Sequence, residues 1–181
     1  MIDNKDIAVL PMDAQADEIN PSLVGVIRTY TGIALNVLNP NAEDICIEDI
    51  AHALSNQCRF GGHTVKFYSV AEHSIHCADM VGPEYALAAL MHDAGEAYLV
   101  DVPSPIKIVL PQYIEIEDRL MQVIAEKYGF EWPMHHMVKR ADKAMLDMEW
   151  KNLMLTDNWV PMPPEYACAR FLELFDKITS K

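Results

Sequence analysis

The chain of 181 residues is poor in basic side chains: 14 Lys and Arg stand against 27 Asp and Glu, which gives a formal net charge of −13 at pH 7. Proteins that bind a nucleic-acid polymer draw much of their affinity from Lys and Arg that neutralise phosphates. The shortage of positive charge therefore argues against nucleic-acid polymers as partners. Small phosphorylated compounds remain possible, because a metal ion or a few local cations can reverse the field around a site.

Long apolar runs are also lacking. No stretch approaches the roughly 18 consecutive apolar residues that a membrane-spanning helix needs, so we expect no membrane association. The first residues, MIDNKDIAVLPMDAQ, carry acidic groups where a secretory signal has positive charges and then an apolar stretch. We therefore expect a cytoplasmic protein.

Cysteines are few and are not paired in sequence. Cys46, Cys58, Cys77 and Cys168 form no CxxC motif and lack the density of a disulfide-stapled secreted domain. We interpret them as reduced thiols.

Internal repeats and low-complexity segments are absent, and 181 residues lie near the usual size of one domain. We therefore expect a single domain over residues 1–181. Residues 1–21 are polar, acidic and interrupted by Pro11 and Pro21, which is typical of a loosely held N-terminal arm.

Strand signals are confined to VIRTYTGIALNVLNP, where β-branched and aromatic residues surround a Thr31-Gly32 turn, so we expect one short hairpin. The rest is helical in pattern, except for DVPSPIK at 101–107, whose two prolines predict a loop. The expected fold class is all-α, a bundle of about six helices with a small N-terminal β-hairpin. The expected helices cover residues 47–57, 69–82, 83–98, 111–128, 133–154 and 165–178.

Two of these helices carry polar groups where apolar side chains should be buried. His73 lies in VAEHSIHCADM, and His92 and Asp93 lie in MHDAGEAY. Divalent metals bind imidazole nitrogen together with carboxylate oxygen, and a helical bundle supplies such ligands from several helices. We choose Asp142 as the last ligand, because a carboxylate on the apolar face of its helix is costly unless it is paired or metal-bound. The alternative is that Asp142 only pairs with a neighbouring Lys or Arg and that Asp147 binds the metal.

The ordered set His73, His92-Asp93 and Asp142 resembles the HD-domain superfamily of metal-dependent phosphohydrolases. HDAGEA followed by DVPSPIK is similar to the branch that contains 5'-deoxynucleotidases and phage dATP triphosphohydrolases. The resemblance implies that Glu96 and Asp101 assist catalysis. It also implies a role for Arg59, which precedes the first metal histidine by 14 residues, in binding phosphate.

Further cations could contact a longer phosphate chain. His63 and Lys66 follow Arg59 in RFGGHTVKF, and Lys107 lies in the proline-containing loop. Arg59 suits phosphate because its planar guanidinium donates hydrogen bonds in pairs. The alternative for Arg59 is a structural bridge between helices. Glu149 could hold Arg59 in place or could be a solvated charge.

The expected activity is therefore hydrolysis of a deoxynucleotide by metal-activated water. The substrate would be either a dNTP, with dATP preferred, or a deoxynucleoside monophosphate. The metal would be Co, Mn, Zn, Fe, Ni or Mg. By analogy with the superfamily, we also expect a homo-oligomer. The alternative is a non-catalytic, metal-stabilised module that senses nucleotides without turnover.

Overall fold

The structure, a computed structural model, describes residues 24–180, so the predicted arm of residues 1–21 lies outside the described residues. The chain enters the fold through the predicted hairpin. Strand β1 (Val26–Arg28) pairs antiparallel with β2 (Ala34–Asn36), with Ile27 opposite Leu35. Gly32 takes a φ of +92° in the connecting turn, a conformation that glycine adopts without steric cost.

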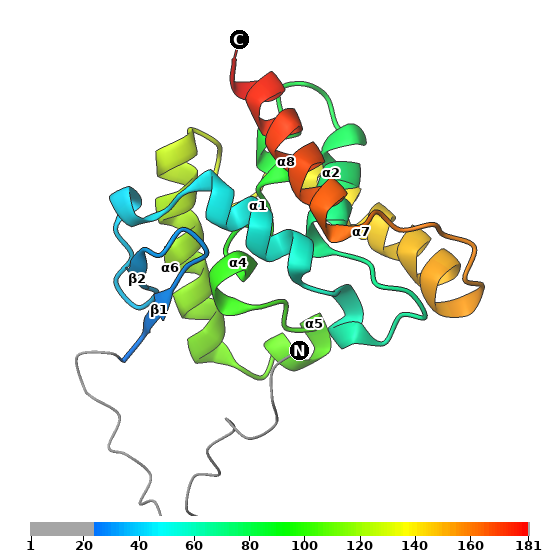
Figure 1. Cartoon of the computed structure of the whole chain (residues 1–181), viewed down its shortest axis with the longest axis horizontal. Coiled ribbons are helices and arrows are strands. Elements are labelled where there is room, and N and C mark those ends of the chain that lie inside the picture. The colour runs from blue at the N-terminus through cyan, green and yellow to red at the C-terminus, as the bar shows by residue number, and fades with distance from the viewer. Residues whose placement is uncertain (1–23, 181) are drawn as a thin grey trace, which may run out of the picture.

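Helices make up most of the remaining described chain, which confirms the predicted fold class (Figure 1). The eight α-helices of residues 24–180 are α1 (Ile47–Asn56), α2 (Val70–Asp79), α3 (Ala86–Leu90), α4 (Glu96–Leu99), α5 (Ser104–Lys107), α6 (Pro111–Tyr128), α7 (His136–Glu149) and α8 (Pro164–Thr179). Two short 3₁₀ turns, η2 (Ala42–Asp44) and η3 (Arg59–Gly62), precede α1 and α2, respectively. The π-helix η4 (Trp150–Leu155) continues α7.

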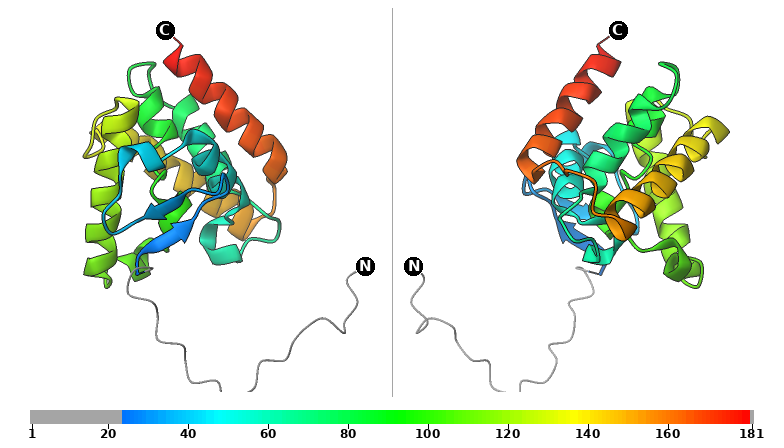
Figure 2. Two further views of the ribbon diagram at one scale, coloured as in Figure 1. Left: turned by 60° about the vertical axis from the view of Figure 1, so that its left-hand side comes forward. Right: turned by 90° about the vertical axis from the view of Figure 1, so that its right-hand side faces the viewer.

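The core lies where α8 packs across α1, α2 and α3. Figures 1 and 2 show α8 lying over α1 and α2, with the hairpin on the other side beside α6. Ile50, Leu54, Ile75 and Phe171 are completely or almost completely buried there. Burying side chains of this size stabilises the fold by about 1.5–3 kcal/mol each. The position of α2 is therefore fixed by packing on several sides.

Several predicted helix ends are confirmed. The Ser69 hydroxyl accepts a hydrogen bond from the Glu72 N–H at 3.1 Å, which caps α2. The Glu72 carboxylate does not reach back as in a full capping box; it accepts from Trp159 Nε1 and the Met162 N–H. Gly129 ends α6 in the left-handed conformation.

The predicted helix over residues 83–98 is wrong in one respect, because the structure breaks it into α3 and α4. Residues 91–95 form tight turns, with the Ala94 N–H bonded to the Met91 carbonyl and the Glu96 N–H to the Asp93 carbonyl. Gly95 lies against α6, and a Cβ there would lie 3.1 Å from the Met121 side chain. A larger residue at this position would therefore push the Met121 side chain away by a few tenths of an ångström.

Two other boundaries also differ from prediction. The proline-containing stretch 101–107 is not entirely loop: α5 begins at Ser104, because Pro105 fits the first turn of a helix. Helix α7 begins at His136 rather than near Pro133, because the His135 ring accepts from the Met137 N–H and caps the helix. In residues 24–180, no helix combines the length and the hydropathy needed to cross a lipid bilayer.

Candidate metal centre

The four predicted metal ligands converge. His73 comes from α2, His92 and Asp93 from the turn between α3 and α4, and Asp142 from α7. The two Nε2 atoms of His73 and His92 lie 3.2 Å apart. His73 Nε2 lies 3.3 Å from Asp142 Oδ1, and His92 Nε2 lies 3.3 Å from Asp93 Oδ2. Side chains from three separate parts of the chain therefore meet at one point.

The two histidine rings are oriented by bonds on their other nitrogens. His73 Nδ1 lies 2.6 Å from Glu149 Oε1, and His92 Nδ1 lies 2.7 Å from the Ala89 carbonyl. When Nδ1 donates to such an oxygen, Nε2 carries the free lone pair that a metal ion needs. Both Nε2 atoms face the convergence point, and in that neutral tautomer each would offer its lone pair to an ion.

Glu149 is completely buried and holds three groups at once. Besides His73, it accepts from the Tyr68 hydroxyl at 2.8 Å and from Arg59 Nε at 3.2 Å. Burial alone would raise the pKa of Glu149, but the contacts with His73, Arg59 and Tyr68 lower it. Of the two alternatives for Glu149, the structure places it as the partner of Arg59 and not as a solvated charge.

Asp142 is the most exposed of the four, with 40% of its side chain accessible, whereas Asp93 is 18% accessible and the histidine side chains are buried. Burial would raise the pKa of Asp142, but its hydrogen bond to His73 and the charges of His92, His73 and Arg59 lower it to about 2. Asp142 is therefore a carboxylate at neutral pH. The cluster is open to solvent on the Asp142 side.

Cys77 belongs to the same cluster and was missed by sequence reasoning. Its Sγ lies 3.5 Å from His73 Nε2, and His73, Cys77, His92 and Asp142 each place a ligand atom within 4.8 Å of the others. The spacing from His73 to Cys77 is i to i+4, which puts both on one face of α2. That spacing was the available signal. All four cysteines are free, as predicted.

The donor set fits a divalent metal ion. Two imidazole nitrogens 3.2 Å apart can both lie about 2.1 Å from one ion, which is the usual nitrogen–metal distance for zinc. Nitrogen and carboxylate oxygen together suit Zn, Mn, Fe, Co and Ni, and the thiol of Cys77 adds a softer donor on the buried side. The buried group of His73, Cys77, His92 and Asp142 could therefore hold a metal ion.

His76, the other histidine of α2, lies outside the cluster. Its Nε2 lies 3.6 Å from Glu72 Oε1, and its ring meets Trp159 edge to face at 5.3 Å between centroids. These contacts are structural and give no reason to place a second ion there.

The two residues predicted to assist catalysis flank the cluster. Glu96 is buried at the start of α4, where Oε1 accepts from Lys107 at 3.1 Å and Oε2 has no hydrogen-bond partner. Burial, together with repulsion from Asp93 and Asp101, raises the pKa of Glu96 well above its ordinary value. Burial also raises the pKa of Asp101. Both carboxyl groups are thus easier to protonate here than in water.

Arg59 contacts the cluster directly, because its Nη1 lies 3.5 Å from Asp93 Oδ2. It begins the turn η3, in which Phe60 takes a left-handed φ of +56°. Such a conformation is uncommon for residues other than glycine, and strain of this kind often accompanies a functional site. The turn brings the Phe60 ring to 6.1 Å from Trp150, between ring centroids.

A cavity of ≈690 Å³ opens beside Arg59. Its volume falls in the range of small-molecule sites. Trp150, which starts the π-helical segment after α7, forms part of its wall, and such segments are frequent at functional sites. The lining residues include Arg59, Phe60, His63, Asp101, Leu146, Asp147 and Trp150. The predicted phosphate-binding residue Arg59 and two aromatic side chains, Phe60 and Trp150, therefore line the same cavity.

Two predicted substrate contacts are engaged elsewhere. Lys107 is bound by two carboxylates, Glu96 at 3.1 Å and Glu117 at 2.7 Å. Lys66 pairs with Asp157 at 3.1 Å and does not line the cavity. His63 does line it and is exposed. Asp147, the substitute ligand, lines the cavity, whereas Asp142 lies in the cluster.

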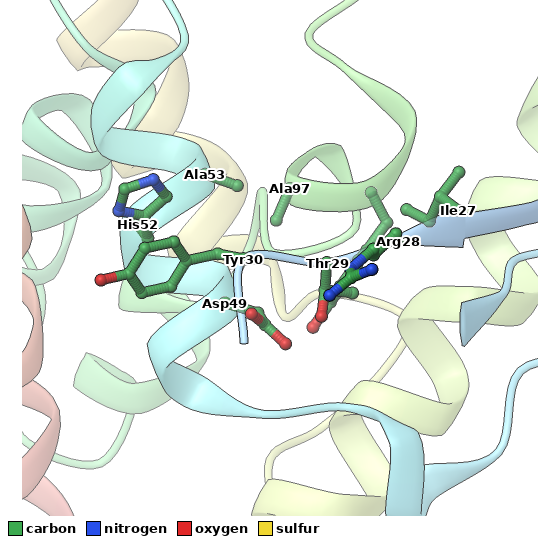
Figure 3. A pocket seen from close by; sticks show the side chains of 9 residues that line it. Ile27, Arg28, Thr29, Tyr30, Asp49, His52, Ala53 and Ala97 are labelled. Atoms are coloured by element: carbon green, nitrogen blue, oxygen red, sulfur yellow. The ribbon is translucent and has the colours of Figure 1, made fainter. Parts of the chain in front are cut away.

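A second cavity, of ≈300 Å³, lies between the hairpin, α1 and α4 and holds none of the predicted site residues (Figure 3). Tyr30 stacks on His52 at its edge, with 3.7 Å between the ring centroids. Asp49 accepts from both the N–H and the hydroxyl of Thr31. These polar groups thus fasten the hairpin turn to α1.

No protein-family model matches the chain. It is 38% identical to Uncharacterized protein RCAP_rcc00048 of Rhodobacter capsulatus, over 65% of each chain. It is 41% identical to Uncharacterized protein YfdR of Escherichia coli K12, over 84% of this chain and 95% of that protein. The helical architecture and the buried ligand cluster are consistent with an HD-like domain. At this identity and coverage, the chain belongs to the same protein family as YfdR.

Proposed function

We propose that the chain is a metal-dependent phosphohydrolase that acts on a deoxynucleotide. The observation that carries this proposal is the convergence of His73, His92, Asp93 and Asp142 next to a cavity that Arg59 and Asp101 line. A metal site that only stabilises a fold is closed by its protein ligands, whereas a catalytic site keeps an open position. The exposed side of Asp142 supports an open position here.

His73, His92, Asp93 and Asp142 would hold the divalent ion, which would lower the pKa of a bound water and so supply a nucleophile for phosphorus near neutral pH. The residues around it have separate tasks. Glu96 has one buried, unpartnered oxygen, which can orient the attacking water and accept its proton. Asp101 lines the cavity and can donate a proton to the leaving 5'-oxygen. Arg59 can bind the phosphate oxygens with the nitrogen that faces Asp93.

The cavity offers a place for the nucleoside. Phe60 and Trp150 are tilted by 54° to each other on its wall, and an aromatic surface binds any nucleobase by stacking. The cationic or titratable basic groups on this wall, counted over residues 24–180, are Arg59 and His63. Because Lys66 and Lys107 are held by carboxylates, this count favours a monophosphate substrate. A triphosphate, dATP above all, is the second candidate, since bound substrate could draw Lys66 away from its exposed partner Asp157.

The proposal is tested by incubating the purified protein with dAMP or dATP and Mn²⁺ or Co²⁺, and identifying the products. Inorganic phosphate from dAMP supports a 5'-deoxynucleotidase, and triphosphate from dATP supports a triphosphohydrolase. Binding of either nucleotide without product would contradict hydrolysis and favour the non-catalytic sensor.

Two variants separate chemistry from metal binding. We expect Asp93→Ala to abolish turnover with the fold intact. Glu96→Gln should lower kcat by about 10²–10⁴-fold while metal content is kept, because it removes a general acid–base group but no metal ligand. Glu126→Gln, an exposed change on α6, is the matched control and should leave kcat unchanged.

A further inference from the structure

The two carboxyl residues Glu96 and Asp101 lie on one short segment whose backbone changes direction between them. Helix α4 ends at Leu99, and Val100 follows with a φ of +67° and a ψ of 154°. This region is rarely occupied by residues other than glycine, so the segment needs outside contacts to hold it. On one side, the Tyr113 hydroxyl of α6 donates to the Val100 carbonyl at 2.6 Å.

On the other side, a single amide spans the segment. Gln57 Nε2 donates to the Glu96 carbonyl at 2.9 Å, and Gln57 Oε1 accepts from the Asp101 N–H at 3.0 Å. Both bonds go to the backbone of a residue that the proposed mechanism uses. Both polar atoms of the Gln57 side chain thus hold the spacing between Glu96 and Asp101.

Gln57 is itself fixed at the junction of two helices. Its N–H bonds to the Ala53 carbonyl at the end of α1, and its carbonyl accepts from the Val70 N–H at the start of α2. Val70 precedes His73, a predicted metal ligand, by three residues on the same helix. One helical turn and a series of hydrogen bonds therefore connect His73, through Gln57, to Glu96 and Asp101.

We propose that Gln57 is a positioning residue that sets the two carboxyl groups relative to the metal cluster. This inference rests on the proposed phosphohydrolase function. Gln57 does not itself line the cavity, and its side-chain hydrogen bonds go to the backbone of Glu96 and Asp101 rather than to a metal ligand. Its effect would be on the geometry of proton transfer, to which rates are sensitive at the scale of 1 Å.

Two variants test the two hydrogen bonds of the Gln57 side chain one from the other. Gln57→Leu removes both, whereas Gln57→Glu keeps the acceptor for the Asp101 N–H and loses the donor to Glu96. Asn56→Ala is the matched control, because the exposed Asn56 amide bonds only within its own helix, to the His52 carbonyl. The readouts are kcat and KM for the nucleotide that the wild type hydrolyses, bound Mn²⁺ per chain, and the exchange rate of the Asp101 amide hydrogen measured by NMR.

We expect Gln57→Leu to lower kcat by about 10–100-fold with little change in KM and no loss of Mn²⁺. The Asp101 amide should exchange faster in Gln57→Leu and stay protected in Gln57→Glu, and Asn56→Ala should match the wild type throughout. Unchanged kcat in Gln57→Leu, or a loss of kcat that follows a loss of bound Mn²⁺, would overturn the positioning role.

The amide exchange experiment distinguishes failure of this inference from failure of the proposed function. If the wild type hydrolyses no nucleotide, the proposed function and the positioning role both fail. Faster Asp101 exchange in Gln57→Leu would then still establish that Gln57 holds the segment. An unchanged Asp101 exchange rate in Gln57→Leu would show that Gln57 does not hold the segment.

Discussion

Glu149 is the residue whose role depends most on tertiary structure. Its sequence position, seven residues after Asp142, places it on the same face of α7 but does not reveal its partners. The structure buries it completely and gives it His73, Tyr68 and Arg59. A buried carboxylate is stable only when it is paired and hydrogen-bonded, and here all three partners donate. It connects the ligand His73 to the phosphate-binding candidate Arg59.

Replacing Glu149 should therefore weaken metal binding without removing a ligand. We expect Glu149→Gln to lower the affinity for Mn²⁺ by about 10–100-fold, because His73 loses the charged partner that orients its ring and raises its basicity. The measurement is calorimetric titration of the metal-free protein. Tyr68→Phe removes a neighbouring bond to the same carboxylate and should have a smaller effect. Equal affinities in Glu149→Gln and the wild type would show that the contact with His73 does not tune the site.

Lys107 should control the protonation of Glu96. Its ammonium lowers the pKa of Glu96, which burial and two neighbouring carboxylates raise. Lys107→Met removes that effect, so the pKa of Glu96 should rise further. If Glu96 acts as the base, activity is lost as pH falls through its pKa, and the acidic limb of the kcat profile should move to higher pH. Lys139→Met, an exposed change on α7, is the control. An unshifted acidic limb would argue against Glu96 as the base.

At the scale of elements, the turn between α3 and α4 is what lets adjacent residues share one site. In a continuous helix, neighbouring side chains point about 100° apart, so His92 and Asp93 could not both face His73. The sequence of residues 83–98 favours a helix, because it is rich in Ala and Leu. At the end of the break, Gly95 packs against Met121 of α6, which lies 26 residues away in sequence. Local propensity could not reveal it.

The end of α4 stores strain that one substitution should release. Val100 has a φ of +67° and is 60% exposed, so its side chain contributes little packing to offset the strained backbone. We expect Val100→Gly to raise the free energy of unfolding by about 1 kcal/mol, as relief of strain exceeds the entropy cost of glycine. Urea denaturation measures this change. Val160→Gly, at an 87% exposed position with an ordinary φ, should be slightly destabilising. A destabilised Val100→Gly protein would mean that Val100 is not strained.

At the scale of the molecule, the sequence predicted the fold class, the hairpin and the convergence of His73, His92, Asp93 and Asp142, because each depends on a local pattern or a known spacing. It did not predict Cys77 in the cluster or the pairing of Lys107 with Glu96 and Glu117. Those contacts depend on how α2, α5 and α6 are oriented, which no short stretch encodes. That residues 1–181 form a single domain stays a prediction.

Self-association also remains a prediction, and the surface suggests where to test it. Ile106, Ile108, Val109 and Ile114 are all more than 40% exposed around α5 and the start of α6. Exposed apolar groups gathered in this way often mark protein–protein contacts. If the chain is a homo-oligomer through this surface, Ile108→Asp should convert it to a monomer in light scattering. An oligomer that survives this change would place the interface elsewhere, and a monomeric wild type would contradict self-association.

The central claim is that imidazoles and carboxylates from three parts of the chain hold one divalent ion. Titration of Mn²⁺ into the metal-free protein, followed by electron paramagnetic resonance of the free ion, tests it most directly. The account predicts one bound ion per chain in the wild type and none at the same concentrations in Asp142→Ala, with unchanged circular dichroism. Wild-type binding in Asp142→Ala, or no binding in the wild type, would contradict it.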